Sequence, residues 1–373
     1  MVQLIVLLPT RVFGGHERML VQWLRQAVAR HRVQVRIYGA SNEELARECE
    51  SAGLGRPVVS HPSRASSLRD FYLTWRLLGE LPRDVPVLFA PGALQLAPLQ
   101  WLAAFLRRRR VAGYVPMAYS SERMRFRGGL LRDWIVARVI RRVDVWITIS
   151  AQQRDLLLEH WQVQPPVLVV PNRLSFRDED ALRAPTGTGA VLRVLFAGRF
   201  DANQKGLDWL CDRLRARRDQ WSGRMRFTFK GQGSFQAALE RLSEELGRQN
   251  VEVLPWGDVR RAAAEADVLL LPSRYEGLPL VALEATHFGM PIVGTNDAGV
   301  SDFVRPSCRF EFGDEQAMWT ALQSLRDPAE RAAALAYSRE RLEQSLTAST
   351  FRLAVDRVVA ALAPARTALE VAR

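Results

Sequence analysis

The amino-acid sequence predicts an α/β protein with two domains, each built on a doubly wound parallel sheet. Short apolar runs alternate with longer amphipathic stretches along most of the chain, which is the pattern of parallel strands joined by helices. A polar stretch rich in chain-breaking residues interrupts this alternation near the middle, and the alternation then starts again. The chain has 373 residues, 48% of them hydrophobic, which is enough for two ordinary hydrophobic cores.

The first domain is expected to span residues 1–172. The apolar run Val2–Leu8 predicts its first strand rather than a signal peptide, because it has neither a basic leader nor a cleavage site. An amphipathic helix is expected from about Glu17 to Arg30. Later apolar runs predict the other strands, at Val33–Tyr38, Val87–Ala90, Val111–Val115, Val143–Ile149 and Val167–Val170.

Residues 173–190 predict a linker or surface loop, and residues 191–349 a second domain. Its strands are expected at Leu192–Ala197, Phe227–Phe229, Val251–Leu254, Val268–Leu271 and Pro291–Gly294. Two helices are expected after them, over residues 328–347 and 350–362, and residues 350–373 are treated as a separate C-terminal segment.

Charge is distributed unevenly along the sequence. The formal net charge is +12, and residues 107–142 alone hold 11 Arg against Glu122 and Asp133, which gives +9. The three cysteines lie far apart without metal-ligand spacing, so a reducing cytosol is the expected compartment. No apolar run has the length of a membrane span. Because the basic excess forms one patch and no nucleic-acid-binding motif occurs, nucleic acid is not an expected partner.

The stretch Tyr275–Glu284 carries two carboxylates around a turn that opens a helix. Glu276 follows a predicted strand, at the sheet edge where open α/β sheets bind ligands. Pro279 suits the first helical position, and Glu284 lies in the next turn with a side chain that leans back toward the N-terminus. Helix N-termini also favour anions. Carboxylates for sugar hydroxyls beside amides for a phosphate outline a nucleotide-sugar site.

The segment Pro272–Pro279 and the spacing of its glutamates resemble the Glu-x7-Glu motif of retaining glycosyltransferases of the GT-B fold, specifically family 4. The resemblance is strongest over residues 190–305. It implies two Rossmann-like domains that face an interdomain cleft, with a C-terminal helix that crosses back to the first domain. It also implies that Glu276 orients the donor sugar, that Glu284 holds the ribose, and that Gly277 and Leu278 line the donor site.

Two cations follow the first strand of the second domain. Gly198 and Arg199 come after this strand, and Lys205 opens a predicted helix, which suits a diphosphate. By resemblance, Arg199 and Lys205 bind the donor diphosphate and act as catalytic residues together with Glu276. The alternative is a surface Arg and a Lys that merely flanks a helix.

Three other glycine-containing segments are weaker donor-site candidates. Lys230 and Gly231 follow a predicted strand, and by resemblance Gly257 presents backbone groups to the nucleobase while Gly14 and Gly15 face the donor phosphate. Each has a plain structural alternative as a turn, a loop or a helix entry. Glu17 could instead complement the dipole of the first helix, and His16 has no assigned role.

The basic patch predicts a surface for an anionic membrane or for the acceptor. The residues assigned to it are Arg107, Arg108, Arg109, Arg110, Arg123, Arg125 and Arg127. An amphipathic helix is expected over Leu130–Arg142, and the alternative is a set of ordinary helices that cover the sheet. The corresponding location is the cytoplasm, peripheral on the inner face of the cell membrane.

One departure from the family pattern concerns a histidine that lines the cleft in many members. No histidine occurs between His61 and His160, and Tyr119 or Ser120 is the residue there that could contact the sugar instead. A front-face retaining mechanism does not need it, because the leaving phosphate serves as the base. No metal-ligand cluster is visible, so no metal or other cofactor is expected.

These residues predict a hexosyltransferase that uses a UDP- or GDP-sugar donor. The expected acceptor is a glycan or glycolipid, of the lipid-linked or lipopolysaccharide type found in bacterial envelope polysaccharide synthesis. The alternative function is a non-catalytic nucleotide-sugar-binding partner that docks a glycan assembly complex to the membrane.

Overall fold

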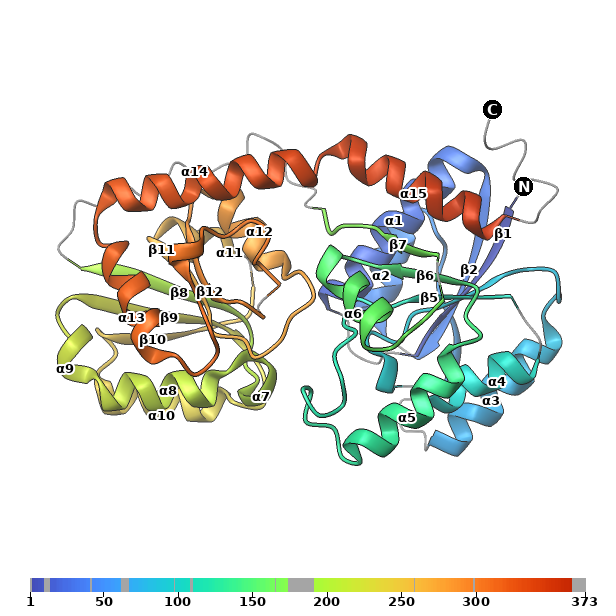
Figure 1. Cartoon of the computed structure of the whole chain (residues 1–373), viewed down its shortest axis with the longest axis horizontal. Helices are drawn as coiled ribbons and strands as arrows, with labels where there is room; N and C mark the ends of the chain where they lie inside the picture. The colour runs from blue at the N-terminus through green and yellow to red at the C-terminus, as the bar shows by residue number, and fades with distance from the viewer. Residues whose placement is uncertain are drawn as a thin grey trace. The chain divides into compact units, whose positions relative to one another are not determined.

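The computed structural model describes residues 2–9, 14–40, 42–61, 67–96, 98–107, 110–164, 166–173, 191–257, 259–297 and 299–363. The chain divides into two compact units, which are coloured along the sequence in Figure 1. The first unit comprises Met1–Asn172 together with Ala348–Arg373, and the second comprises Arg173–Thr347. The chain therefore returns to the first unit after completing the second. The predicted linker lies outside the described residues except for Arg173.

Among its described residues, the first unit forms a seven-stranded parallel sheet of order β3-β2-β1-β4-β5-β6-β7. The direction of winding reverses between β1 and β4, which makes this the switch point of the sheet. The strands are β1 (Val2–Leu8), β2 (Val33–Ala40), β3 (Val58–His61), β4 (Val87–Phe89), β5 (Val111–Tyr114), β6 (Val145–Thr148) and β7 (Val167–Val169). The helices are α1 (Gly15–His31), α2 (Glu43–Ser51), α3 (Ser67–Glu80), η1 (Leu94–Leu96), α4 (Pro98–Leu106), α5 (Gly129–Ile140), α6 (Ala151–Glu159) and α15 (Ala348–Leu362).

In the part of the second unit that the structure describes, six parallel strands have the order β10-β9-β8-β11-β12-β13, with the switch point between β8 and β11. The strands are β8 (Leu192–Arg199), β9 (Met225–Gln232), β10 (Val251–Pro255), β11 (Val268–Leu271), β12 (Ile292–Thr295) and β13 (Arg309–Phe310). The helices are α7 (Ala202–Lys205), α8 (Leu207–Ala216), α9 (Arg218–Trp221), α10 (Gln236–Leu246), α11 (Val259–Ala264), α12 (Leu280–His287), η3 (Pro306–Cys308), α13 (Glu315–Ser324) and α14 (Pro328–Ser345).

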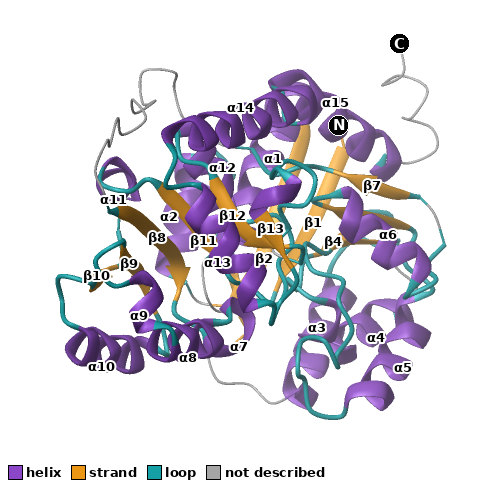
Figure 2. Cartoon of the chain, turned by 60° about the vertical axis from the view of Figure 1, so that its left-hand side comes forward, coloured by secondary structure: helices purple, strands orange, loops and turns teal. Residues whose placement is uncertain are grey.

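The predicted fold class is confirmed, since both sheets are parallel and helices flank them (Figure 2). The buried strands were predictable because a strand covered on both faces is a nearly continuous apolar run. Strand β3 was not predicted. It lies at the sheet edge, where Val58 and Val59 are 52% and 62% exposed, so its sequence lacks the long apolar run of a central strand.

The strands that lead to the candidate site are longer than predicted. β8 and β9 pair in register over eight residues each, and the last pair is Arg199 with Gln232. Arg199 and Gly198 therefore end a strand, and Lys230 and Gly231 lie inside one, instead of following it. A ladder between two neighbours continues past the apolar residues, because it depends on backbone hydrogen bonds rather than on side-chain burial.

Helix boundaries near the candidate site also differ from the prediction. Lys205 ends the short helix α7 instead of opening a helix, and Gly206 then caps α8 at a φ of +66°. Pro279 is the N-cap of α12 rather than its first helical residue. Helix α1 begins at Gly15, two residues before the predicted start at Glu17.

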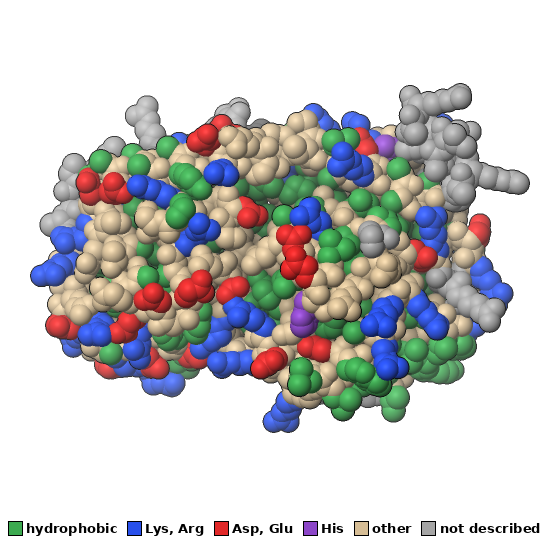
Figure 3. All heavy atoms as spheres, in the orientation of Figure 1, with side chains coloured by type: hydrophobic (Ala, Val, Ile, Leu, Met, Phe, Trp, Pro, Cys, Tyr) green, Lys and Arg blue, Asp and Glu red, His purple; other side chains and the backbone are tan. Residues whose placement is uncertain are grey.

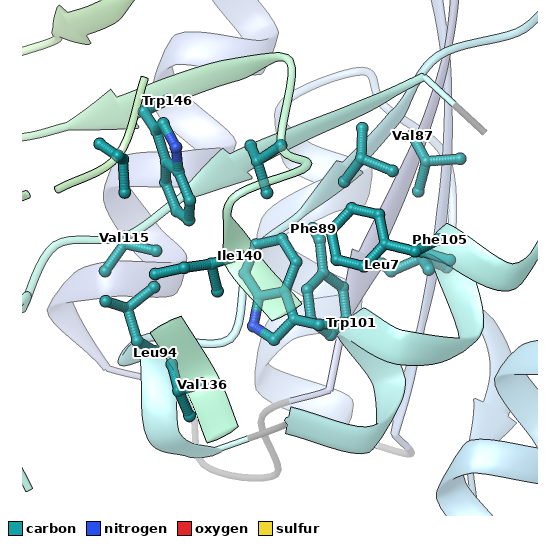
Figure 4. Packing of buried hydrophobic residues seen from close by; sticks show 14 of the residues in the cluster. Leu7, Val87, Phe89, Leu94, Trp101, Phe105, Val115, Val136, Ile140 and Trp146 are labelled. Atoms are coloured by element: carbon teal, nitrogen blue, oxygen red, sulfur yellow. The ribbon is translucent and has the colours of Figure 1, made fainter. Parts of the chain in front are cut away.

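Large aromatic side chains fill the core between the first sheet and helices α4 and α5. Phe89 on β4 meets Trp101 on α4 edge to face, with ring centroids 4.4 Å apart, and Trp146 on β6 lies beyond it (Figure 4). Val136 and Ile140 bring the inner face of α5 into the same cluster. One stripe of α5 is thus committed to the core of the first unit.

The C-terminal helix α15 is fixed to the first unit by charged groups at two places. Asp356 accepts hydrogen bonds from Arg30 and His31 at the end of α1, and the His31 Nε2–Asp356 Oδ1 distance is 2.6 Å. Arg110 donates to the carbonyl oxygens of Ala361 and Ala363, at 2.6 and 2.9 Å. A cation suits this position, because the last carbonyls of a helix have no partner inside the helix.

These contacts change the interpretation of the basic patch. Arg107 stacks on Trp75, with its guanidinium carbon 3.9 Å from the ring centroid, and its Nε donates to the carbonyl of the same residue. Arg107 and Arg110 therefore have intramolecular roles that the sequence analysis did not foresee. Arg108 and Arg109 lie outside the described residues.

The anchoring of α15 is testable through Asp356. We expect Asp356→Ala to destabilise the first unit by about 1–2 kcal/mol, because a carboxylate that accepts hydrogen bonds from both Arg30 and His31 is lost. Burial raises the pKa of Asp356, but hydrogen bonds from His31 and Arg30 outweigh this and leave it lowered. The stabilisation should therefore be complete at pH 7 and fade below about pH 4, as the carboxylate takes up its proton.

Thermal unfolding of the wild type and the variant across this pH range provides the measurement. Glu80→Ala is the matched control, because Glu80 pairs with Arg76 on α3 while both side chains are more than 60% exposed. Its effect should be small. Two outcomes would contradict the anchoring role. One is a loss of unfolding free energy in Asp356→Ala that is no larger than in the control. The other is a loss that increases as the pH falls.

Candidate functional site

The candidate site lies at the switch point of the second sheet. The carboxyl ends of β8 and β11 meet there, and crevices at such points are where open α/β sheets bind ligands. Strand β8 ends in Arg199 and leads through Asp201 into α7, while β11 leads into the loop that carries Glu276. Two segments about 70 residues apart in the sequence are thereby brought together.

A buried ion pair joins these two segments. The ammonium of Lys205 contacts Oε1 of Glu276, and the two side chains are 12% and 9% exposed. The hydroxyl of Ser273 also donates to the same carboxylate, at 3.1 Å. A buried charge without a partner is costly, so each member of this pair fixes the position of the other.

Gln204 links this pair to Arg199. Its side-chain oxygen accepts from Arg199 Nη2, and its Nε2 lies 3.4 Å from Glu276 Oε2. Its backbone amide donates to Asp201, which caps α7. Arg199, Lys205 and Glu276, which the sequence analysis selected, therefore belong to one connected cluster. Their catalytic roles remain predictions.

Glycine makes the close approach of the two segments possible. A Cβ on Gly206 would lie 2.1 Å from the carbonyl oxygen of Pro272, at the end of β11. The positive φ of Gly206 also favours glycine. On the other side of β8, a Cβ on Gly231 would lie 1.9 Å from the Gly198 carbonyl oxygen. Close packing against β8 thus explains a glycine at position 231 without any contact with a donor.

Tyr275 is buried beside the ion pair and remains protonated at neutral pH. Burial raises its pKa to about 12, and the negative charges of Asp201 and Glu276 act in the same direction. Asn203 Nδ2 lies 3.5 Å from its hydroxyl. Tyr275 can therefore donate a hydrogen bond but is unsuited to act as a base.

The remaining predicted donor residues of this unit lie along the same sheet edge. Gly277 and Leu278 are buried in the loop before α12, and Glu284 is half-buried on the second turn of that helix. Lys230 donates to the carbonyl of Pro255 at 3.2 Å, near Gly257. The assignment of these residues to a donor site remains a prediction.

Gly14 and Gly15 belong to the first unit, where Gly14 caps α1 and Gly15 is its first residue. The Glu17 carboxylate accepts from the Gly14 amide at 2.9 Å, and its other oxygen lies 3.1 Å from His16 Nδ1. His16 stacks on the buried ring of Tyr114, with centroids 5.2 Å apart. Glu17 thus caps α1 and complements its dipole, as in the structural alternative to a ligand contact.

Helix α5 presents a second apolar stripe outward. We call this surface the α5 face, and it combines exposed apolar residues with the cations of the preceding loop: Leu130, Leu131, Trp134, Ile135, Arg123, Arg125 and Arg127. Leu130 and Leu131 are 80% and 67% exposed, and Arg138 stacks on Trp134 at 4.0 Å. Green and blue side chains accordingly adjoin at the lower right of Figure 3, over α3 to α5. The helix is apolar on two sides, not amphipathic as predicted.

Within the described residues, no helix combines the length and the apolar character that crossing a bilayer requires.

Sequence reasoning did not select Gln204, Ser273 or Arg274. Their sequence signal is only adjacency, since Gln204 precedes Lys205 and the other two precede Glu276. Whether such a residue contributes to the site depends on which residue of the other segment it contacts. That partner is visible only once β8 and β11 are side by side.

Two family models match the sequence. The model for glycosyl transferases group 1 matches residues 192–327, and the model for Glycosyltransferase Family 4 matches residues 13–174. The first match falls within the second unit, and the second match covers the first unit from residue 13 and ends two residues beyond Asn172.

Several curated proteins are similar to parts of the chain. An uncharacterized 41.2 kDa protein of the cps region of Klebsiella pneumoniae is 33% identical over 116 residues, which is 30% of either chain. The amylovoran biosynthesis glycosyltransferase AmsK of Erwinia amylovora is 27% identical over 36% of this chain and 34% of its own length. The lipopolysaccharide 1,6-galactosyltransferase of Salmonella typhimurium is 26% identical over 47% of this chain and 49% of its own. The chain thus spans about a third to a half of the length of these relatives.

Solved structures show the likeness of fold over nearly the whole chain. Anabaena HepE in complex with UDP-glucose superposes with a TM-score of 0.74 at 16% identity, covering 96% of this chain and 99% of that one. The lipopolysaccharide outer core galactosyltransferase WaaB gives a TM-score of 0.68 at 15% identity, with coverage of 96% and 99%. At such identities the likeness concerns the fold, which is the GT-B fold that the sequence resemblance implied.

With a matching family model on each unit and this fold throughout, the chain belongs to the group 1, family 4 glycosyltransferases.

Proposed function

We propose that this protein is a hexosyltransferase that moves a sugar from a nucleotide diphosphate sugar, with UDP or GDP as the nucleotide, to a glycan acceptor with retention of configuration. The observation that carries the proposal is the cluster of Arg199, Lys205 and Glu276 at the switch point of the second sheet. Two cations beside a carboxylate match a donor that has a diphosphate at one end and hydroxyls at the other. The complex of Anabaena HepE with UDP-glucose supports a donor of this class.

In the proposed reaction, the bond between the anomeric carbon and the phosphate oxygen breaks, and the acceptor oxygen bonds to the same face of the sugar. The acceptor proton passes to the leaving phosphate, so no histidine base is required. Arg199 and Lys205 offset the negative charge that grows on the diphosphate, and Glu276 orients the sugar. These fixed cations supply the charge that a metal ion would otherwise provide, so the proposal includes no metal.

The role of the cations predicts a large kinetic effect. Arg199→Ala and Lys205→Ala should each lower turnover on the order of 100-fold or more, as the loss of a transition-state charge partner does. Arg199 is exposed, so its variant should fold normally. Lys205→Ala also leaves Glu276 buried without its cation, which costs about 3–5 kcal/mol of stability, and it should be assayed well below its Tm.

Steady-state assays of sugar transfer, or of slow donor hydrolysis, measure this effect. Arg226→Ala is the matched control, because Arg226 is a half-exposed arginine on β9 that donates to a carboxylate, Glu252. Near wild-type turnover in both Arg199→Ala and Lys205→Ala would show that the diphosphate binds elsewhere.

Substitutions of the two glutamates should have different effects on nucleotide binding. Glu284→Ala is expected to weaken the affinity for free UDP or GDP, because Glu284 is assigned to the ribose. Glu276→Gln should leave that affinity within a few-fold of the wild type but impair transfer, because Glu276 is assigned to the sugar. Calorimetric titration with the bare nucleotide distinguishes them. An equal loss of nucleotide affinity in both variants would refute this division of roles.

We further propose that the acceptor is a lipid-linked or lipopolysaccharide-type glycan, reached from the cytoplasmic side of a bacterial membrane. The similarity to a protein of a cps region and to a lipopolysaccharide 1,6-galactosyltransferase supports this acceptor class. The α5 face supports the location, because exposed Leu130, Leu131 and Trp134 lie beside three exposed arginines. Apolar groups that enter the interface and cations that meet anionic headgroups act together in peripheral binding.

The membrane proposal predicts selective binding to anionic vesicles. The wild type should sediment with phosphatidylcholine vesicles that contain phosphatidylglycerol and not with pure phosphatidylcholine, and salt should weaken the binding. Changing Arg123, Arg125 and Arg127 to Gln should reduce it, since each cation near the surface contributes about 1 kcal/mol. Leu131→Ser with Trp134→Ser should reduce it further.

The matched control removes three exposed arginines from the second unit, with Arg241, Arg248 and Arg261 changed to Gln. The net charge falls equally, so only the position differs. If the wild type fails to bind at low salt, or if the control loses as much binding as the loop variant, the α5 face is a solvated surface and the acceptor is soluble.

A further inference from the structure

Arg274, which precedes Tyr275 and Glu276, ties the glutamate loop to helices α7 and α8. Its Nη1 donates to the carbonyl oxygens of Ala202 and Asn203 at 2.7 and 2.8 Å. Both of its terminal nitrogens donate to the Asp208 carboxylate, at 2.8 and 2.9 Å. We call this set of contacts the Arg274 clasp. The arginine side chain is 12% exposed, so the clasp is largely withdrawn from solvent.

The clasp closes around the residues of the proposed diphosphate site. Ala202 and Asn203 belong to α7, whose last residue is Lys205, and Asp208 lies in the first turn of α8. The backbone amide of Arg274 also donates to the Gln204 carbonyl at 2.9 Å. One residue of the glutamate loop thus holds the segment that carries Lys205 at four oxygen-bearing groups.

Helix α7 needs such support, because it is only one turn long. A single helical turn in isolation is unfavourable, since it fixes several residues for one or two hydrogen bonds. Arg274 supplies two carbonyl oxygens of α7, those of Ala202 and Asn203, with a cationic donor. The stacking of the Arg274 guanidinium over the Phe312 ring at 4.4 Å fixes the plane of the fork.

The chemistry of the clasp is specific to arginine. A planar guanidinium directs its N–H groups toward a carboxylate and toward backbone carbonyls at once, whereas an ammonium is a single point charge on a flexible stem. Lysine at position 274 would keep the charge but lose this geometry. The ion pair of Lys205 with Glu276 would then bridge two segments that no longer move as one.

We propose that Arg274, acting with Asp208, is a positioning residue that fixes Lys205 and Arg199 relative to Glu276. The inference rests on the proposed function, because it deepens the account of the same site. Arg274 acts through α7 and through Gln204, which in turn contacts Arg199. Small displacements of groups that bind a transition state are expensive, and about 1 Å can cost 100-fold in rate.

The test compares two arginine-to-lysine variants in the same unit. Arg193 forms a similar two-pronged contact with a buried carboxylate, Asp267, at 2.8 and 3.0 Å, but at the opposite end of β8 from the site. Arg274→Lys and Arg193→Lys each remove a two-pronged arginine–carboxylate contact, and both should lower Tm. Only Arg274→Lys should lower kcat, by on the order of 10-fold or more. Asp208→Asn keeps an acceptor but loses the charge, so its kcat should lie between that of Arg274→Lys and that of the wild type.

Hydrogen exchange gives a second measurement that needs no substrate. The amides of α7 should exchange faster in Arg274→Lys than in the wild type, and at the wild-type rate in Arg193→Lys. Unchanged exchange in α7, or equal losses of kcat in the two lysine variants, would overturn the positioning role. If the wild type turns over neither UDP- nor GDP-sugars, the proposed function fails, while the exchange experiment still decides whether the clasp holds α7.

Discussion

A carboxylate withdrawn from water needs a cationic partner. The site of the second unit depends on the ion pair that supplies Glu276 with one. Its partner Lys205 comes from a segment that enters the site from β8, whereas Glu276 enters from β11. The pair can form only because these strands are neighbours at the switch point, where the two loops leave in the same region. The close passage of Gly206 over the Pro272 carbonyl and the Arg274 clasp both serve to bring the cation within reach. Breaking a buried pair by removing one partner is far more costly than losing a surface pair.

The arginines of the first half of the chain separate into two kinds once the fold is known. Arg107 donates to a carbonyl group and stacks on the ring of Trp75 inside the first unit. Arg110 donates to carbonyl groups of the returning helix α15 and helps to fix it. Arg123, Arg125 and Arg127 remain exposed beside the outward apolar stripe of α5. The two kinds are indistinguishable in composition, yet only the second kind lies beside exposed apolar side chains. A patch defined by charge along the sequence is therefore broader than the patch that the surface presents.

Much of the fold was predictable because parallel sheets have a strong sequence signal. Central strands such as β1 and β11 are covered on both faces and are therefore almost uninterrupted apolar runs. The edge strand β3 was missed because exposure at the edge removes that signal. Strand ends were misplaced for a related reason. The β8–β9 ladder continues to Arg199 and Gln232 through backbone hydrogen bonds, which leave no mark on side-chain polarity.

By itself, the sequence determined the two-domain α/β organisation, the family and the identity of the charged residues gathered at the second switch point. These follow from apolar periodicity and from motif spacing, which are local properties of the chain. Only the tertiary structure decided how those residues are connected. Gln204 bridges Arg199 to Glu276, Arg274 holds α7, and Arg110 caps α15. Each of these contacts joins groups whose partners are set by strand order and helix packing. A side chain's hydrogen-bond partner is therefore a property of the folded neighbourhood and not of its position in the sequence.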